Sequence, residues 1–341
     1  MQGHAPQAVL PRLAEHGADV DWVSQWHFDL PFLPPPPASA HPHYGVLTAT
    51  TQAFLTAHGV LRTPSDVDRF RRHDLAMWTV FCYPDCPLES QQLIADFIAL
   101  AAEWDHLLSQ PEGRGRATEL ISPLKDITEN RAPSGNSRFL RAWADVWRRW
   151  CEGMPAPWCA RTAEHWSAIF AALIDEDLTE TAQAPLTIGE KCRLRDETGL
   201  QSVLFDLIER GGGFTLPSRI RDLAPIQSML FHANRQIWVT NEVQSLPKEL
   251  ADGESNLVLL LEAAGKTRSA ALAEVHRMVR SHTDTFLAAE AATPRALDEL
   301  AVPVEERVDV YRFIAGMRTI MAGTATWCGN SGRYQQYVLD R

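Results

Sequence analysis

Apolar side chains recur along this chain mostly at intervals of three and four residues, which is the period of an α-helix. The clearest stripe runs between residues 140 and 150, and it consists of Leu140, Trp143, Val146, Trp147 and Trp150. This spacing puts the five side chains on one face of a helix, with arginine and aspartate between them on the other. No alternation with a period of two is sustained, so the pattern predicts an all-α protein.

Similar stripes predict further helices over 203–208, 257–264, 272–279 and 308–320. The last stripe combines six apolar residues: Val308, Tyr311, Phe313, Ile314, Met317 and Ile320. Loops are expected at 110–116, 131–137, 152–157 and 211–218, where glycine, proline and small polar residues gather. We therefore expect a single helical domain over residues 27–341, with roughly ten or more helices, preceded by a loosely ordered leader over 1–26.

A proline-rich segment precedes the first predicted helix. Phe28-Asp29-Leu30-Pro31-Phe32-Leu33 leads directly into four prolines, Pro34 to Pro37. Proline fixes φ and lacks an amide proton, so this segment is predicted to be extended. We expect it to pack over the helical body through Phe28, Phe32 and Leu33; a proline segment that binds a partner is the alternative.

Composition narrows the function classes. Of the 341 residues 45% are hydrophobic and 22% are charged, which suits a buried core. The net charge of -11 argues against a nucleic-acid partner, because phosphate contacts need clustered lysine and arginine. Apolar runs such as 97–102 and 257–261 are too short to span a membrane. The N-terminus lacks a signal-peptide pattern and the six cysteines lack paired zinc-ligand spacing, which predicts a cytoplasmic protein with free thiols.

The segment with the most specific chemistry lies between residues 241 and 249. Asn241, Ser245 and Glu249 are spaced i, i+4 and i+8, which stacks an amide, a hydroxyl and a carboxylate along one helix face. Such oxygen ligands suit Mg²⁺, which favours phosphate as a co-ligand, and Lys248 could add a cation. Pro247 predicts a kink. The alternative is a solvated polar helix face without a metal.

This segment resembles the second metal-binding motif of class I terpene synthases, (N/D)Dxx(S/T)xxxE, which often carries a lysine before the glutamate. Glu242 stands where aspartate is usual, at a position that is not a ligand. The family's other motifs have counterparts in the same order along the chain. They are Arg195-Asp196-Glu197-Thr198-Gly199 and Trp327-Cys328-Gly329-Asn330-Ser331-Gly332-Arg333-Tyr334, with the minor matches Phe28–Phe32 and Tyr83-Pro84-Asp85.

The resemblance implies roles for individual residues. Arg195 would bind the substrate diphosphate, Thr198 would act as a linker, and Gly199 would expose an effector carbonyl at a helix break. Lys248, Arg333 and Tyr334 would also bind the diphosphate. Trp327 would lie near the substrate cavity. The remaining aromatic residues that we considered are assigned to the core by default: Trp78, Phe81, Trp104 and Trp238.

The family's first, aspartate-rich motif is degenerate here, because the chain contains no Asp-Asp pair. The best-placed candidate is Asp105, with His106 and Ser109 in place of the later acidic residues. Glu103 would point elsewhere on a helix. The alternative is that Asp105 is an ordinary surface residue and that this metal site has been lost.

The resemblance implies a single-domain class I terpenoid synthase helical bundle around a central apolar cavity. The resemblance also implies Mg²⁺ as the cofactor, with three ions held by Asp105, Asn241, Ser245 and Glu249. These ions would bind a linear isoprenyl diphosphate, either farnesyl or geranylgeranyl diphosphate, and the C15 chain is favoured. Ionisation and cyclisation would follow, with release of diphosphate; a homodimer is compatible with this reading. The alternative is a non-catalytic helical protein that binds an isoprenoid. A prenyltransferase is disfavoured by the missing Asp-Asp pairs, and a class II cyclase by the missing DxDD.

Overall fold

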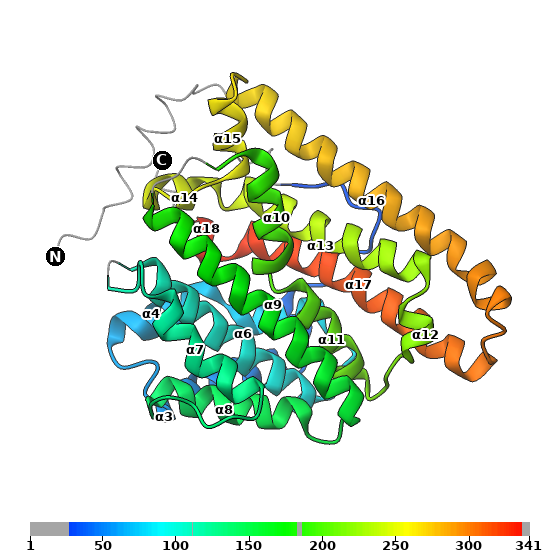
Figure 1. The fold of residues 1–341 in the computed structure, drawn as a ribbon, viewed down its shortest axis with the longest axis horizontal. Coiled ribbons are helices and arrows are strands. Elements are labelled where there is room, and N and C mark those ends of the chain that lie inside the picture. Colours follow the sequence, from blue (N-terminus) through cyan, green and yellow to red (C-terminus); the bar gives the residue numbers. More distant parts are fainter. Residues whose placement is uncertain (1–26, 111, 183–185, 336–341) are drawn as a thin grey trace. The chain divides into compact units, whose positions relative to one another are not determined.

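The computed structural model describes residues 27–110, 112–182 and 186–335, which form helices joined by short connections (Figure 1). No strand occurs within these ranges, so the predicted all-α fold is confirmed. Contacts divide the described residues into two compact units. The N-terminal unit contains 36–186 and 192–216, and the C-terminal unit contains 27–35, 187–191 and 217–335. The single domain stays a prediction, and the predicted leader over 1–26 lies outside the described residues.

The N-terminal unit contains a short 3-10 helix, η2, and α-helices of 8 to 26 residues. They are η2 (Ala38–Ala40), α3 (Tyr44–Ala57), α4 (Pro64–His73), α5 (Leu75–Cys82), α6 (Leu88–Ser109), α7 (Ala117–Thr128), α8 (Arg138–Cys151), α9 (Ala156–Thr181) and α11 (Gln201–Gly212). Helix α10 (Ile188–Thr198) begins in the C-terminal unit and ends in this one. Within the unit, α6 packs against α3, α5, α8 and α11, and α7 packs against α8 and α9.

Helix α8 follows directly from its sequence pattern. The Ser137 hydroxyl caps the helix by accepting a hydrogen bond from the Leu140 amide at 3.1 Å. All five residues of the predicted stripe are buried, and Val146 and Trp150 are fully so. Burying a side chain of this size contributes roughly 1.5–3 kcal/mol, so the stripe fixes which face of α8 points inward.

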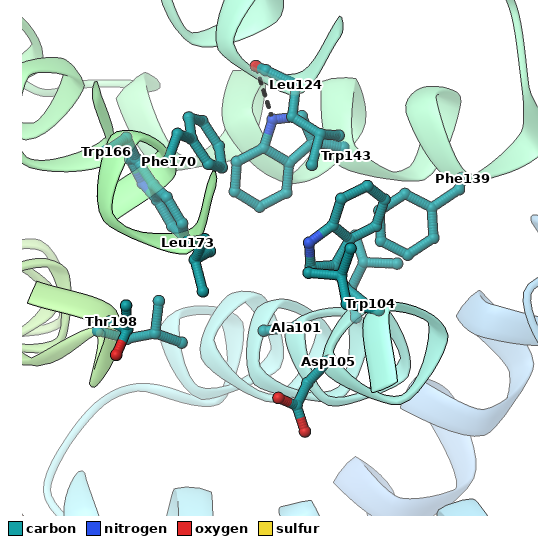
Figure 2. A pocket seen from close by; sticks show the side chains of 13 residues that line it. Ala101, Trp104, Asp105, Leu124, Phe139, Trp143, Trp166, Phe170, Leu173 and Thr198 are labelled. Atoms are coloured by element: carbon teal, nitrogen blue, oxygen red, sulfur yellow. Dashed lines mark hydrogen bonds between the residues drawn. The ribbon is translucent and has the colours of Figure 1, made fainter. Parts of the chain in front are cut away.

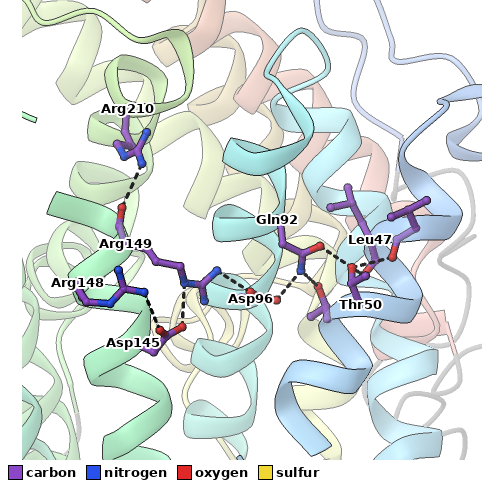
Figure 3. A network of polar contacts seen from close by, with 10 residues as sticks. Leu47, Thr50, Gln92, Asp96, Asp145, Arg148, Arg149 and Arg210 are labelled. Atoms are coloured by element: carbon purple, nitrogen blue, oxygen red, sulfur yellow. Dashed lines mark hydrogen bonds and ion pairs between the residues drawn. The ribbon is translucent and has the colours of Figure 1, made fainter. Parts of the chain in front are cut away.

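A buried polar network joins α3, α6 and α8 (Figure 3). Asp96 of α6 is 2% exposed and accepts hydrogen bonds from Arg149 at 2.9 Å and from Gln92 at 2.7 Å. Burial raises the pKa of Asp96, and the neighbouring Arg149 and Gln92 oppose that rise. Arg149 also pairs with Asp145 at 2.8 Å. A buried carboxylate with these partners is costly to displace, so the network fixes α6 against its neighbours.

The C-terminal unit is built around three long helices. Its elements are α12 (Ser218–Arg221), α13 (Ala224–Gln244), α14 (Leu246–Asp252), α15 (Leu257–Ala263), α16 (Arg268–Glu299), α17 (Val304–Asn330) and α18 (Gly332–Gln335). Helix α13 packs against both α16 and α17 (Figure 1). Gly265 separates α15 from α16 with φ +96°, a left-handed conformation that favours glycine.

The proline-rich segment contacts helices of its own unit. The Phe28 ring stacks on His276 of α16 with centroids 4.4 Å apart, and Phe32 meets Phe286 edge-on at 6.1 Å. The predicted packing is therefore confirmed for both phenylalanines. It is wrong for Leu33, which is 93% exposed.

The last predicted stripe was too wide. In α17 the side chains of Phe313, Ile314 and Met317 are buried, whereas Val308 is 55% and Tyr311 45% exposed. An apolar residue on a helix surface costs little, so the pattern at the start of α17 does not mark the buried face.

Membrane spans and cysteine pairing can be judged over all of the described residues. None of its described helices is both long and apolar enough to cross a membrane. All six cysteines are free thiols, as expected from their spacing.

Candidate functional site

A break interrupts the helical path between residues 198 and 201. Helix α10 ends at Thr198 and α11 begins at Gln201, with Leu200 in the left-handed region at φ 66°. The Gln201 side chain lies so close to Gly199 that a β-carbon there would come within 2.1 Å of its Oε1. A glycine is therefore the residue that fits without displacing the buried Gln201 amide. The helix break expected from the sequence is present, while the roles of Arg195, Thr198 and Gly199 stay predictions.

The N-terminal unit contains an apolar pocket beside this break (Figure 2). The space between its walls is about 550 Å³, part of it open to solvent. Helices α6, α7, α8 and α9 supply most of the lining. The lining residues are Leu100, Ala101, Trp104, Asp105, Leu108, Leu124, Phe139, Trp143, Trp166, Phe170, Leu173, Thr198 and Leu200.

Aromatic rings form much of this lining. Trp104 and Phe139 lie with centroids 4.9 Å apart, Trp143 meets Trp166 edge-on at 4.8 Å, and Trp166 lies 5.3 Å from Phe170. The indole N–H of Trp143 donates to the Leu124 carbonyl at 3.3 Å, which ties α8 to α7 (Figure 2). Ring faces carry negative charge density, so such a pocket attracts a cation while excluding water.

The expectation that Trp104 belongs only to the core is incomplete. Trp104 is buried, but it also lines the pocket. The other four rings were missed as pocket residues. A usable signal existed: Phe139 and Trp143 are four apart, as are Trp166 and Phe170, and this spacing puts each pair on one helix face.

Only two polar side chains line the pocket, and the sequence predicted both as functional. Asp105 is exposed on the last turns of α6, where its carboxylate points away from the aromatic rings (Figure 2). Thr198 is 8% exposed, and its hydroxyl has no hydrogen-bond partner among the described residues. The structure thus brings the candidate first metal ligand and the linker of the helix break to one pocket.

Glu103 and His106, which flank Asp105 in the sequence, contact other residues, and Arg195 lies outside the pocket lining. Glu103 is buried and accepts a hydrogen bond from Arg69 at 3.3 Å, so it points elsewhere, as expected. His106 is half-buried and lies 3.4 Å from the Gln110 amide nitrogen. Arg195 is half-buried in α10 one turn before Thr198, and it is not among the residues that line the pocket.

The candidate second metal motif spans α13 and α14 in the C-terminal unit. Its helical spacing is kept across the junction, because the Ser245 amide donates to the Asn241 carbonyl at 2.7 Å and the Glu249 amide donates to the Ser245 carbonyl at 2.9 Å. The junction lies where Pro247 predicted a kink. Asn241, Ser245 and Glu249 therefore follow one another at successive turns, as the sequence predicted.

The C-terminal motif packs on this segment. The Asn241 amide donates to the Tyr334 hydroxyl at 3.1 Å and lies 3.7 Å from the Cys328 sulfur. Trp327 meets the Tyr334 ring edge-on at 5.8 Å, and the Arg333 guanidinium lies 5.7 Å from the same ring. Burial raises the pKa of Tyr334 to about 12. Its hydroxyl therefore stays protonated and could donate a hydrogen bond to a diphosphate.

Trp327 belongs to the C-terminal unit, whereas every residue that lines the pocket belongs to the N-terminal unit. Its placement beside the substrate cavity stays a prediction.

The last two residues of the second motif have acidic and amide partners. The Lys248 ammonium pairs with Glu254 at 2.9 Å and with Asp252 at 3.2 Å. The Glu249 carboxylate accepts a hydrogen bond from Asn256 at 2.6 Å. Both side chains are held in place by residues that the sequence analysis did not single out.

The donor chemistry of the motif fits a hard divalent cation. Asn241, Ser245 and Glu249 offer an amide, a hydroxyl and a carboxylate oxygen, which are ligands of Mg²⁺ and not of a soft metal. No cluster of three or more histidine, cysteine or acidic side chains with metal-binding geometry occurs in the described part of the chain. The donor types of Asn241, Ser245 and Glu249 support an all-oxygen site.

Comparison with known proteins decides the family. Residues 96–285 match the model of terpene synthase family 2, C-terminal metal binding. This span covers more than half of the chain, and it contains Asp105, the helix break and the second metal motif. The chain belongs to this terpene synthase family.

Curated relatives are similar to the terpene synthase over most of its length. Pentalenene synthase of Streptomyces avermitilis is 28% identical over 313 residues, which cover 90% of this chain and 93% of that protein. (-)-beta-Caryophyllene synthase of Saccharothrix espanaensis is 28% identical over 317 residues, which cover 91% of this chain and 89% of that protein.

Solved structures support the fold. A variant of cucumene synthase has a TM-score of 0.80 and 26% identity, covering 90% of this chain and all of that one. An α-eudesmol synthase has a TM-score of 0.82 and 23% identity, covering 89% and 99%. The bundle expected from the sequence is thus the class I terpenoid synthase fold.

The terpene synthase is a metal-dependent enzyme that binds an isoprenyl diphosphate. The expected activity, ionisation and cyclisation with release of diphosphate, is that of a class I terpene synthase, and the non-catalytic alternative is not favoured.

Proposed function

We propose that this terpene synthase converts the C15 substrate farnesyl diphosphate into a cyclic terpene hydrocarbon or alcohol. The single observation that carries the proposal is the apolar pocket that has five aromatic rings in its lining and Asp105 and Thr198 as its polar members. A relative described as cyclising (2E,6E)-farnesyl diphosphate supports the chain length.

In this proposal the metal is Mg²⁺, present as three ions. Asp105 holds it from α6, and Asn241, Ser245 and Glu249 hold it from the second motif. Bound Mg²⁺ supplies the positive charge that stabilises the leaving diphosphate. This explains how a chain of net charge -11 accommodates an anionic substrate.

Basic and polar side chains complete the diphosphate site. Arg195, Lys248 and Arg333 contribute cations, and Tyr334 contributes a hydroxyl that stays protonated. Thr198 and Gly199 at the helix break face the reacting end of the substrate, where the backbone carbonyl of Gly199 stabilises developing positive charge.

The pocket lining then controls the fate of the allyl cation. Aromatic faces stabilise positive charge, and the scarcity of polar side chains limits capture by water. Neither polar residue of the lining is suited to be a dedicated base, since Asp105 is assigned to the metal and Thr198 carries a hydroxyl. We therefore assign the final proton transfer to the released diphosphate.

The proposal is tested by incubating the purified protein with the C10, C15, C20 and C25 isoprenyl diphosphates in Mg²⁺, with a matched set in EDTA. Gas chromatography with mass spectrometry identifies the products. We expect cyclic C15 products in Mg²⁺ and none in EDTA. Preferential turnover of the C20 substrate would overturn the chain length, and no product from any substrate would overturn the function.

We further propose a cytoplasmic enzyme that is compatible with a homodimer. The six free thiols support the location, because such thiols persist in a reducing compartment. Size-exclusion chromatography with light scattering measures the oligomeric state directly.

A further inference from the structure

The connection between α14 and α15 carries a fully buried asparagine whose amide makes three hydrogen bonds. Asn256 is 0% exposed. Its Oδ1 accepts from the Val258 amide at 2.8 Å, and its Nδ2 donates to the Glu242 carbonyl at 2.8 Å and to the Glu249 Oε2 at 2.6 Å.

The partners of Asn256 determine which way its amide faces. A backbone N–H such as that of Val258 only donates, and a carbonyl such as that of Glu242 only accepts. The oxygen of Asn256 must therefore face α15, and its NH₂ group must face Glu249. The contact with Glu249 is thus a donated hydrogen bond to a carboxylate, which is the stronger kind.

Neighbouring contacts immobilise this asparagine. The Lys191 ammonium donates to both the carbonyl and the hydroxyl of Ser255 at 2.9 Å. The buried Glu242 carboxylate accepts a hydrogen bond from the Leu257 amide at 2.7 Å. Glu242, the residue that departs from the family motif, therefore fastens the start of α15 to α13, directly beside Asn256.

We propose that Asn256 is a positioning residue that orients the Glu249 carboxylate for divalent-metal binding. The inference rests on the proposed role of Glu249 as a metal ligand. A glutamate has several rotamers, and a fixed hydrogen bond to one oxygen restricts them and leaves the other oxygen directed away from Asn256. Removing such a partner of a metal ligand typically weakens metal affinity about 10- to 100-fold.

Asn256→Ser is the most informative variant. Serine retains an oxygen that can cap α15, but its side chain is too short to donate a hydrogen bond to Glu249. Asn256→Thr retains the same capping oxygen and fills more of the buried space, so it serves if the serine variant does not fold. Thr267→Ala is the matched control, because Thr267 caps α16 in the same unit by accepting from the Ala270 amide, away from the motif.

Binding is measured with Mn²⁺ as the probe, by electron paramagnetic resonance in the presence of inorganic diphosphate. We expect Asn256→Ser to weaken Mn²⁺ binding about 10- to 100-fold, and Thr267→Ala to leave it unchanged. Turnover of the serine variant should recover as the Mg²⁺ concentration rises. In a Glu249→Gln background, Asn256→Ser should cause little further loss, because it acts through Glu249.

Two results would contradict the proposal, and they differ from each other. Unchanged Mn²⁺ affinity in Asn256→Ser, with only a lower melting temperature, would reduce Asn256 to a structural cap. Absence of Mn²⁺ binding by the wild-type protein would overturn the proposed metal site together with the role of Asn256.

Discussion

Asp105 and Thr198 are the polar side chains at a pocket that is otherwise apolar. In the proposed function, this contrast directs the chemistry to one end of the substrate. The carboxylate of Asp105 lies away from the rings, so charge and aromatic surface are separated within a few side chains (Figure 2). A diphosphate and a hydrocarbon chain need the same separation. The polar residues therefore distinguish one end of the pocket from the other, because the aromatic residues of the lining are chemically similar.

Phe139 offers a test of the aromatic lining. It is half-buried beside Trp104, so Phe139→Ala enlarges the pocket and removes one ring that can stabilise the cation. We expect the proportion of acyclic and water-captured products to rise, with a stability loss below the 3–5 kcal/mol or so that is usual for a fully buried phenylalanine. Gas chromatography of the products measures the ratio.

Phe54→Ala is the control for Phe139→Ala. Phe54 is half-buried in α3 of the same unit and does not line the pocket. An unchanged product ratio in Phe139→Ala, or an equal change in Phe54→Ala, would remove Phe139 from the proposed lining.

The junction of α10 and α11 is the element on which the proposed ionisation depends. Its shape comes from close packing of Gln201 on Gly199 and from the left-handed Leu200. A non-glycine residue with positive φ stores strain, and such strain is often found where a segment must hold or change a functional conformation.

Gly199→Ala tests this junction. The added β-carbon would lie 2.1 Å from the Gln201 Oε1, and Gln201 is 4% exposed, so its amide group must shift within a packed environment. We expect a destabilisation of about 1–3 kcal/mol, as for other overpacked sites, and a loss of turnover. Thermal unfolding and product formation measure the two effects.

Gly189→Ala is the matched change, in the first turn of α10, the helix that precedes the break. Nothing lies within 4 Å of a β-carbon at Gly189, so alanine there should be neutral or stabilising by up to about 1 kcal/mol. Full turnover in Gly199→Ala would contradict the proposed role of the junction.

Helices were predictable from the sequence wherever every apolar residue of the periodic stripe is buried. The α8 stripe is an example, because every apolar position in it faces the interior. The start of α17 is the counterexample, since Val308 continues the apolar pattern on an exposed face. Periodicity gives the helix and its phase, while the width of the buried face depends on which neighbours pack there.

The polar residues of the site were predictable from the sequence, whereas the aromatic lining was not. The resemblance to the family's motifs pointed to Asp105 and Thr198, and the structure puts both at one pocket. The sequence pattern could not distinguish Trp104, which lines the pocket, from Leu93 in the core, because both lie on the buried side of α6. A helix pattern shows that a residue points inward and not whether side chains or empty space lie opposite. Asn256 was missed for a related reason, since its partners are set by tertiary contacts.

At the scale of the whole molecule, the candidate ligands are divided between the two units. Asp105 belongs to the N-terminal unit, and Asn241, Ser245 and Glu249 belong to the C-terminal unit. We propose that both sets serve one metal-dependent reaction. The acidic balance of the chain fits this claim, because the positive charge that a diphosphate requires comes largely from the metal.

The most direct test measures diphosphate release from farnesyl diphosphate in Mg²⁺ by the wild type, Asp105→Ala, Asn241→Ala and a control, Glu89→Gln, which changes an exposed acid on the same helix as Asp105. We predict that both alanine variants lose at least about 100-fold in rate, as expected when charge stabilisation is removed, and that the control keeps the wild-type rate. Full release by Asp105→Ala alongside abolished release by Asn241→Ala would contradict the claim that a site on α6 contributes to the reaction.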